Sequence, residues 1–155
     1  MTQPITLREE GFDQLDADGQ IRVLARAQWD ELERHAELRP FDIDWEGYRR
    51  MSAAGLIYFL AARDGEKLVG FSSYFLTRGM RGPSSALIAF SDMWHVLKPY
   101  RVGLLAARML RAAEHDLRDR GARMVLHCDP HHQSLEAFFV RMGYRPIETI
   151  LEKKL

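Results

Sequence analysis

Two cations and a glycine lie close together where a predicted strand ends and a helix begins. Lys98, Arg101 and Gly103 follow the apolar stretch 92–97 and precede a segment whose apolar residues recur at helical spacing. A basic turn that leads into a helix brings free backbone N–H groups and the positive end of the helix dipole to one point. Phosphate groups bind at such points, so the turn predicts a phosphate site. The alternative is that both cations only decorate a surface turn.

The strand before this turn carries two side chains that could accept a proton. Asp92 stands at the head of an otherwise apolar strand, where a carboxylate is costly without a task; it could equally accept backbone hydrogen bonds as a structural residue. His95 has an intrinsic pKa suited to a general base, but it could also be a packed core histidine. Three residues separate the two, so regular alternation predicts that they lie on opposite faces of the sheet. Of the two, Asp92 is the better candidate for proton acceptor or amine anchor.

Four segments together resemble the GNAT superfamily of acyl-CoA-dependent N-acyltransferases. They are Pro99-Tyr100-Arg101, the helix that contains Leu110 and Glu114, the run RDRGA at 118–122 and the run AFFVRMGY at 137–144. An aspartate on the central strand followed by Pro-Tyr-Arg, in a chain that ends in Lys-Lys-Leu, is similar to short acetyltransferase-like proteins found among phage genes. The resemblance runs from about Leu56 to Leu155.

The resemblance implies a donor, acetyl-CoA, and a place for it. In this family the central strand binds the pantetheine arm of coenzyme A through its backbone, and the turn after the strand wraps the pyrophosphate. Carried to this chain, the strand positions are Trp94 and Val96. The turn positions and the cations beside them form the expected pyrophosphate site: Lys98, Arg101, Val102, Gly103, Leu104, Leu105, Ala106 and Arg108.

Two positions depart from the family's pattern. The turn usually reads Arg/Gln-x-x-Gly-x-Gly/Ala, and Leu104 stands where a glycine is usual, so we expect a different turn shape or weaker pyrophosphate binding. The leaving thiolate usually meets a tyrosine four residues before the glycine that ends the last helix, and Phe139 holds that position. A coenzyme A thiol is acidic enough to leave as thiolate near neutral pH, so we expect this change to slow the reaction rather than prevent it.

These residues lead to a hypothesis of N-acyl transfer. The amine must be neutral when it attacks a thioester, so a base accepts its proton, and N–H groups of the central strand stabilise the oxyanion. We expect an N-acetyltransferase in which a primary amine attacks acetyl-CoA directly in a ternary complex. The acceptor could be a small molecule or an amine on a protein, and its pocket could be lined by Trp29, Trp45 and Tyr48. The alternative is a catalytically weak or inactive acyl-CoA-binding or protein-interaction module with the same fold.

The pattern of apolar residues predicts an α/β fold with a mixed sheet. Expected strands span 4–8, 56–62, 67–77, 86–97, 123–128 and 144–155, and expected helices span 20–37, 45–54, 104–120 and 135–142. The order β-α-α-β-β-β-α-β-α-β predicts a GNAT-like sheet of six to seven strands with helices on both faces. Gly70 predicts a bulge or a close backbone contact within its strand. The last strand, at an edge, could pair with a second copy to give a homodimer.

Length and charge limit the remaining possibilities. The 155 residues predict a single acyl-CoA N-acyltransferase-like domain, 1–155. The net charge is zero, which argues against nucleic acid as a partner, yet residues 1–55 carry 7 basic and 12 acidic residues and residues 56–155 carry 15 and 10. This asymmetry suits a transferase that receives a cationic amine on one side and a polyanionic donor on the other, although chance could also produce it.

Cysteine usage and apolar runs indicate the compartment. Cys128 is the only cysteine, which excludes an internal disulfide. No apolar run reaches the length of a membrane span and residues 1–10 lack a signal-peptide pattern, so we expect a cytoplasmic protein with no membrane partner. His127, His131 and His132 surround Asp129 without the spacing of a metal site, so we expect no metal.

Overall fold

A single sheet organises the residues that the computed structural model describes, which are 4–33, 40–79, 86–153 and 155. Its strands are β1 (Thr6–Glu9), β2 (Ile57–Asp64), β3 (Lys67–Arg78), β4 (Leu87–Val96) and β5 (Ala122–Leu126). The helices are α1 (Phe12–Asp16), α2 (Gln20–Leu32), α3 (Trp45–Ala53), α4 (Leu105–Asp119) and α5 (Glu136–Arg141). Two 3₁₀ turns cover Lys98–Tyr100 and His131–Gln133.

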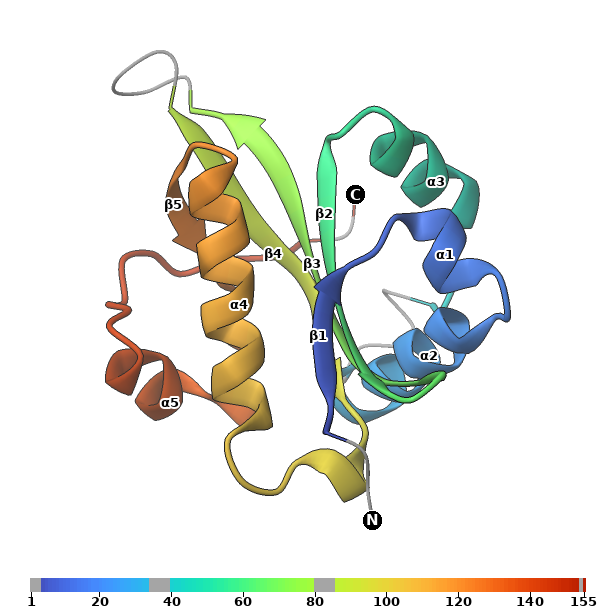
Figure 1. Cartoon of the computed structure of the whole chain (residues 1–155). Coiled ribbons are helices and arrows are strands. Elements are labelled where there is room, and N and C mark those ends of the chain that lie inside the picture. The colour runs from blue at the N-terminus through green and yellow to red at the C-terminus, as the bar shows by residue number, and fades with distance from the viewer. Residues whose placement is uncertain (1–3, 34–39, 80–85, 154) are drawn as a thin grey trace.

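The strands lie side by side in the order β1-β2-β3-β4-β5. The first four are antiparallel to their neighbours, and β5 is parallel to β4 because α4 crosses over between them. Helices α1, α2 and α3 cover one face of the sheet, while α4 and α5 cover the other (Figure 1). The expected mixed α/β fold is confirmed.

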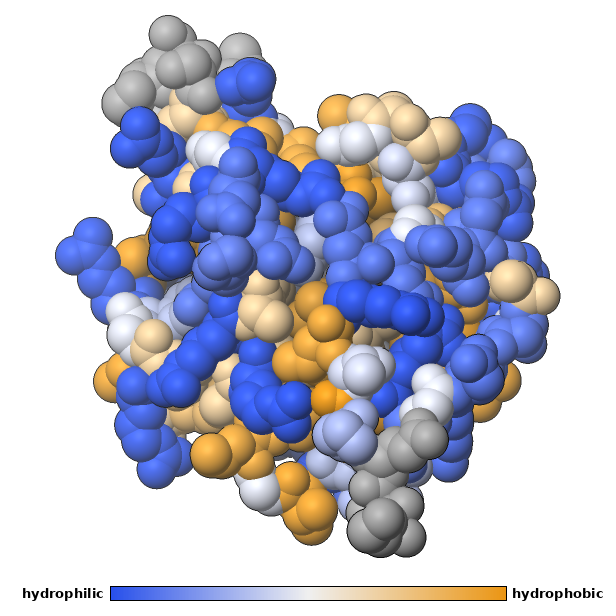
Figure 2. All heavy atoms as spheres, viewed as in Figure 1, coloured by the Kyte–Doolittle hydropathy of each residue, from blue (hydrophilic) through white to orange (hydrophobic). Residues whose placement is uncertain are grey.

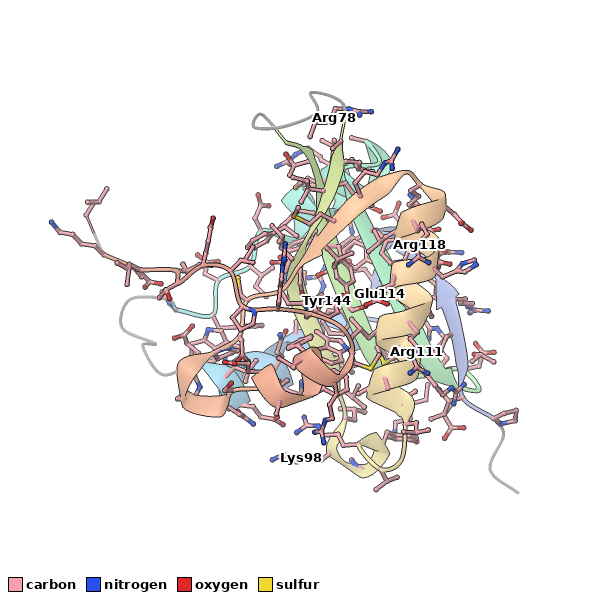
Figure 3. All side chains as sticks on the ribbon, turned by 90° about the vertical axis from the view of Figure 1, so that its left-hand side faces the viewer. Arg78, Lys98, Arg111, Glu114, Arg118 and Tyr144 are labelled. Carbon is pink, nitrogen blue, oxygen red and sulfur yellow. The ribbon has the colours of Figure 1, made fainter. Side chains whose placement is uncertain are left out.

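The expected sixth strand is wrong, and the sheet of the described residues has five strands instead of six to seven. The described part of 144–155 is extended but forms no strand, and Ile147, Ile150 and Leu151 are exposed. Its apolar pattern suits a strand, yet it leaves the body of the molecule instead of pairing with β5 (Figure 3). The predicted end of the first expected helix, at 34–37, lies outside the described residues. The short helix α1 was not predicted.

Two apolar cores hold the layers together. On one face Phe12, Leu15, Ile21, Phe59 and Phe71 pack between the sheet and α1 to α3. On the other face Tyr58, Leu60, Tyr74, Met109 and Leu117 pack between the sheet and α4. The buried residues of α4 recur at spacings of three and four, which places them on one side of the helix. The helix that starts at the predicted phosphate turn is therefore anchored along its length.

Gly70 allows α4 to lie close to the sheet. A side-chain carbon at this position would lie 3.1 Å from the carbonyl oxygen of His95 and 3.3 Å from the sulfur of Met109 on α4. The expected close contact at Gly70 is thus present, and it sets the distance between β3, the end of β4 and the first turns of α4. Among the described residues, no helix has both the length and the apolar character that a membrane crossing needs.

Candidate functional site

The two parallel strands part halfway along β4. The last residue of β4 that pairs with β5 is Phe90, opposite Leu126, so residues 91–96 have no partner on that side. Leu97 N–H donates to the Val69 carbonyl of β3, 2.9 Å away. In an antiparallel ladder alternate residues bond to the neighbouring strand, so Trp94 and Val96 direct their backbone groups away from β3. Among the described residues, the two predicted strand positions therefore present N–H groups without partners at the open edge.

Both carbonyls at this edge are already taken by side chains of the same molecule. The Trp94 carbonyl accepts a hydrogen bond from the Gln28 amide of α2 at 3.4 Å, and the Val96 carbonyl accepts one from Arg101 Nε at 2.6 Å. Both bonds use only the carbonyls, and the N–H groups of Trp94 and Val96 donate to no other described residue. Sequence reasoning missed Gln28, which lies 66 residues from Trp94.

The turn after β4 ends in a helix start with free donors. Gly103 adopts a left-handed conformation, with φ of +71°, and a side-chain carbon there would meet open space. None of the described side chains caps α4, so the N–H groups of its first residues, Leu105 and Ala106 among them, lack partners. Leu104 is 74% exposed and Leu105 is 5% exposed. The Leu105 side chain therefore packs in the core under α4, while the Leu104 side chain, where the family usually has a glycine, is largely in solvent.

Hydrophobic residues surround the same turn on the surface. Figure 2 shows them gathered below α4, where Figure 1 places the turn, and Val102 is 76% exposed. The side chain of Val102 is apolar and largely exposed, so it offers no polar group to a phosphate. Val102, like Leu104, can therefore contribute to the predicted site only through its backbone or through apolar contact with a ligand.

The three predicted cations do not converge on the turn. Arg101 donates to Glu31 of α2 at 2.7 Å, and Lys98 lies 3.7 Å from the same carboxylate. Arg108 donates to the carbonyl of Ile5, beside β1, at 3.1 Å. Lys98 and Arg101 thus stay near the start of α4 but are held by one glutamate. Figure 3 shows Lys98 beneath the first turn of α4.

Asp92 lies in a bulge of β4. Ser72 pairs with Trp94 and Tyr74 pairs with Ser91, so Ser73 alone opposes both Asp92 and Met93. Asp92 Oδ2 accepts hydrogen bonds from Tyr48 Oη of α3 at 2.7 Å and from Ser73 Oγ at 3.0 Å. Burial raises the pKa of the Asp92 carboxyl, and the two hydroxyl donors oppose that rise. One oxygen of a desolvated carboxylate is therefore fixed.

The bulge also overturns the expectation that Asp92 and His95 lie on opposite faces. His95 is directly opposite Phe71, which belongs to the core under α1 to α3, and Asp92 bonds to Tyr48 on that same side. The extra residue shifts the alternation by one, so both side chains face α2 and α3. His95 is buried, and burial lowers the pKa of its imidazole. A buried neutral imidazole lies one residue past Trp94, on the other side of the sheet from the Trp94 ring.

Aromatic rings gather where β4 and β5 part, on the α4 and α5 face. The Trp94 ring stacks on Phe138 with centroids 5.6 Å apart, and the His127 and Phe139 rings lie 4.6 Å apart. The hydroxyl of Tyr144 donates to Glu114 of α4 at 2.7 Å, and the two side chains meet in Figure 3. Phe139 is buried and has no polar atom, as the sequence implies. His127 was placed near the end of the expected strand 123–128, and its position inside this aromatic cluster was not expected.

A cavity of about 420 Å³ lies elsewhere, between α4, β5 and the segment that follows α5. Arg118, Arg123 and Tyr144 are among the residues that line it, and none of the predicted site residues does. No cluster of metal-binding side chains occurs within the described parts of the chain.

The geometry can be compared with known proteins. A strand edge with free N–H groups that continues into an uncapped helix start suits an elongated ligand with a phosphate at one end. A family model for the acetyltransferase (GNAT) family matches residues 20–144. The chain belongs to this family. The open edge of β4 and the start of α4 lie within the matched residues. A search of curated proteins finds no match.

Solved structures of other acetyltransferases share the GNAT fold of this chain. One is an aminoglycoside acetyltransferase from an uncultured soil metagenomic sample, with 12% identity, a TM-score of 0.76 and 99% of each chain covered. Another is a predicted acetyltransferase with acetyl-CoA from Clostridium acetobutylicum, with 11% identity, a TM-score of 0.74 and coverage of 97% of this chain and 96% of that one.

A third similar structure is a ribosomal-protein-alanine N-acetyltransferase from Brucella melitensis biovar Abortus 2308. Its identity is 12% and its TM-score 0.72, over 99% of this chain and 100% of that one. At these identities the likeness establishes the fold alone. The acceptors named for these proteins are different, so fold likeness does not select one.

Proposed function

We propose that this GNAT protein transfers an acetyl group from acetyl-CoA to a primary amine, by direct attack of the amine in a ternary complex. The observation that carries the proposal is the run of free backbone N–H groups from Trp94 and Val96 on β4 to the first turn of α4. Acetyl-CoA has amide groups along its arm for a strand edge and a diphosphate for a helix start. When bound, it supplies the acetyl group as a thioester.

The residues of the turn fit a diphosphate by their backbone more than by their charges. Gly103 leaves open space at its α-carbon, and the side chain of Leu105 is buried in the core. Lys98 and Arg101 lie near enough to add attraction, but each must share its charge with Glu31. The helix terminus is therefore the main anion site in this proposal, and the cations are secondary.

Asp92 is the proposed proton acceptor. Its carboxylate is buried, which makes it a stronger base than an exposed one, and Tyr48 and Ser73 both hold the same oxygen. The other oxygen is the one that can take the proton of the attacking amine. Tyr48 is a positioning residue, since its hydroxyl reaches the carboxylate and its ring stacks on Phe75. His95 faces the same side and is the second candidate for the base.

The acceptor remains defined only as a primary amine, on a small molecule or on a protein. The excess of acidic residues in 1–55, which form β1 and α1 to α3, favours a cationic acceptor on the α2 and α3 face. A panel for the first assays should therefore contain an aminoglycoside, a simple diamine and a peptide with a free N-terminal alanine. Release of coenzyme A thiol with any of these, dependent on Asp92, would support the proposed reaction.

Donor binding is tested by ligand-dependent stability. Acetyl-CoA at a hundred times its Kd should add about 2.7 kcal/mol to the free energy of unfolding, which for a domain of this size is roughly 5–10 °C in Tm. Arg101→Glu is a poor control because it would place two carboxylates together at Glu31. Ala106→Glu is better, because it puts a negative charge beside the free N–H groups without breaking an ion pair. Absence of any shift at millimolar acetyl-CoA would remove the proposal.

A second candidate function is an acyl-CoA-binding module without turnover. The observation that favours it is Phe139, which is buried beside His127 and cannot donate a proton to a leaving sulfur. Both candidates predict a rise in Tm with acetyl-CoA. They differ in thiol release, since a module of this kind binds the thioester and never consumes it.

A further inference from the structure

His127 is the first residue beyond the point where β4 and β5 part. The last pair of the parallel ladder joins Phe90 to Leu126, so His127 leaves the ladder and turns into the space between the strands. Rings from β3, β4, α5 and the segment after α5 surround its imidazole, with centroids 4.6–6.1 Å away: Tyr74, Trp94, Phe139 and Tyr144. The imidazole therefore lies inside an aromatic cage, across the gap from the open edge of β4.

The cage leaves His127 with an unsatisfied nitrogen. Nε2 has no accessible surface and no hydrogen-bond partner among the described residues. Ser72 lies directly opposite Trp94, and its buried hydroxyl is within hydrogen-bonding reach of Tyr74. A buried polar atom without a partner is costly. The unpartnered Nε2 beside the gap therefore indicates that a ligand or a water supplies the missing contact.

The Tyr144 side chain in the cage is already engaged, and Phe139 offers no alternative donor. The hydroxyl of Tyr144 donates to Glu114, and Phe139 has no polar atom. Burial lowers the pKa of His127 to about 4, so the ring is neutral at pH 7 and carries one N–H. A neutral imidazole in an apolar cage can donate a hydrogen bond without bringing a charge into the core.

We infer that His127 is a catalytic residue whose Nε2–H donates a hydrogen bond to the sulfur of the acyl donor. The inference rests on the proposed function. As the amine nitrogen bonds to the acetyl carbon, the carbon–sulfur bond breaks and its electron pair goes to sulfur, while the amine proton goes to Asp92. His127 keeps its proton and stabilises the thiolate by a charge-assisted hydrogen bond. The contact forms after the stack of Trp94 on Phe138 shifts, because Nε2 has no accessible surface.

The test compares coenzyme A with desulfo-coenzyme A, which lacks the sulfur, by titration calorimetry from pH 6.5 to pH 9.5. A donor to the thiolate lowers the pKa of the bound thiol below that of the free thiol. Affinity for coenzyme A should then rise relative to desulfo-coenzyme A by about tenfold as pH increases, because binding favours the thiolate. His127→Phe should abolish the rise, and His132→Phe, at an exposed histidine, should keep it.

The cage itself should not titrate over this range. Burial raises the pKa values of Tyr74 and Tyr144, with Glu114 adding to the rise at Tyr144, and His127 is already neutral at pH 6.5. The charged groups that reach the cage are thus Glu114 of α4, through Tyr144, and the bound thiol. A change in relative affinity with pH therefore reports on the sulfur.

A measurement on the unmodified protein tests the inference even if His127→Phe fails to fold. The ¹⁵N resonance of His127 Nε2 should shift with coenzyme A and stay unchanged with desulfo-coenzyme A. If both ligands bind with the same pH dependence, or shift Nε2 equally, the atom is bonded to water only and the inference is wrong. If neither ligand binds, the proposed donor site is wrong as well.

Discussion

A negative charge introduced at Ala106 should have two effects at the uncapped start of α4: it should stabilise the helix and weaken ligand binding. Ala106 is the second residue of α4, where no side chain of the described residues caps the terminus. A glutamate there should stabilise the helix dipole by about 0.3–1 kcal/mol relative to Ala106→Gln, which has the same size. For a domain of this length that is roughly 1–4 °C in Tm. The same carboxylate should compete with a diphosphate for the N–H groups and weaken binding by roughly tenfold to a hundredfold.

The assay is a pair of measurements on the two variants at low ionic strength. Thermal unfolding gives the stability difference without ligand, and titration calorimetry gives the Kd for coenzyme A. We expect Ala106→Glu to be the more stable variant and the weaker binder. Equal affinities in the two variants would refute the assignment of the diphosphate to this helix start, whatever the stability result. Salt should reduce the stability difference because it screens the dipole.

Five further outcomes follow from the described contacts. Asp92→Asn should lower kcat by about a hundredfold to ten-thousandfold. Tyr48→Phe should shift the acidic limb of the pH–rate profile to higher pH, because removing a hydrogen-bond donor raises the pKa of Asp92 further. An unmoved limb would contradict the contact between Tyr48 and Asp92. Glu31→Gln should tighten coenzyme A binding about two- to fivefold by freeing Arg101 and Lys98. If calorimetry shows no gain in affinity, these two cations do not contribute to the diphosphate site. Gly70→Ala should cost roughly 1–3 kcal/mol in urea unfolding, since its new carbon would crowd the strand and α4; a neutral result would contradict the close packing. Sedimentation should show a concentration-dependent dimer, because β5 has an open edge and the segment after α5 exposes apolar residues; a monomer at all concentrations would exclude it.

The sequence predicted those features of the structure that depend on residues close together along the chain. The apolar spacing of 104–120 predicted α4, and Gly121 ends that helix in a left-handed conformation with φ of +89°. The turn with Gly103 and the strand before it were found by their order along the chain. Gly70 was correctly read as a close contact, because a glycine inside a strand has few other reasons to be there.

Features that depend on distant residues could not be predicted in the same way. The faces of Asp92 and His95 were assigned by simple alternation, and the bulge opposite Ser73 reversed the result. No pattern in the neighbouring sequence indicates this bulge, because it is defined by the pairing of β4 with β3. Arg101 was read as a free cation, but its partner Glu31 lies 70 residues earlier. The apolar pattern of 144–155 predicted a strand, but a strand forms only by pairing with a neighbour, and the described part of this segment does not pair with the outer edge of β5.

The central claim is that the arm of acetyl-CoA lies along β4 and that its diphosphate binds at the start of α4. Backbone amide NMR tests this claim most directly. Addition of coenzyme A should move the amide resonances of Trp94, Val96, Leu105 and Ala106 more than those of the other described residues, and the His127 side chain should respond with them. Shifts confined to the cavity between α4 and β5, near Arg118 and Arg123, would place the ligand elsewhere and contradict the account.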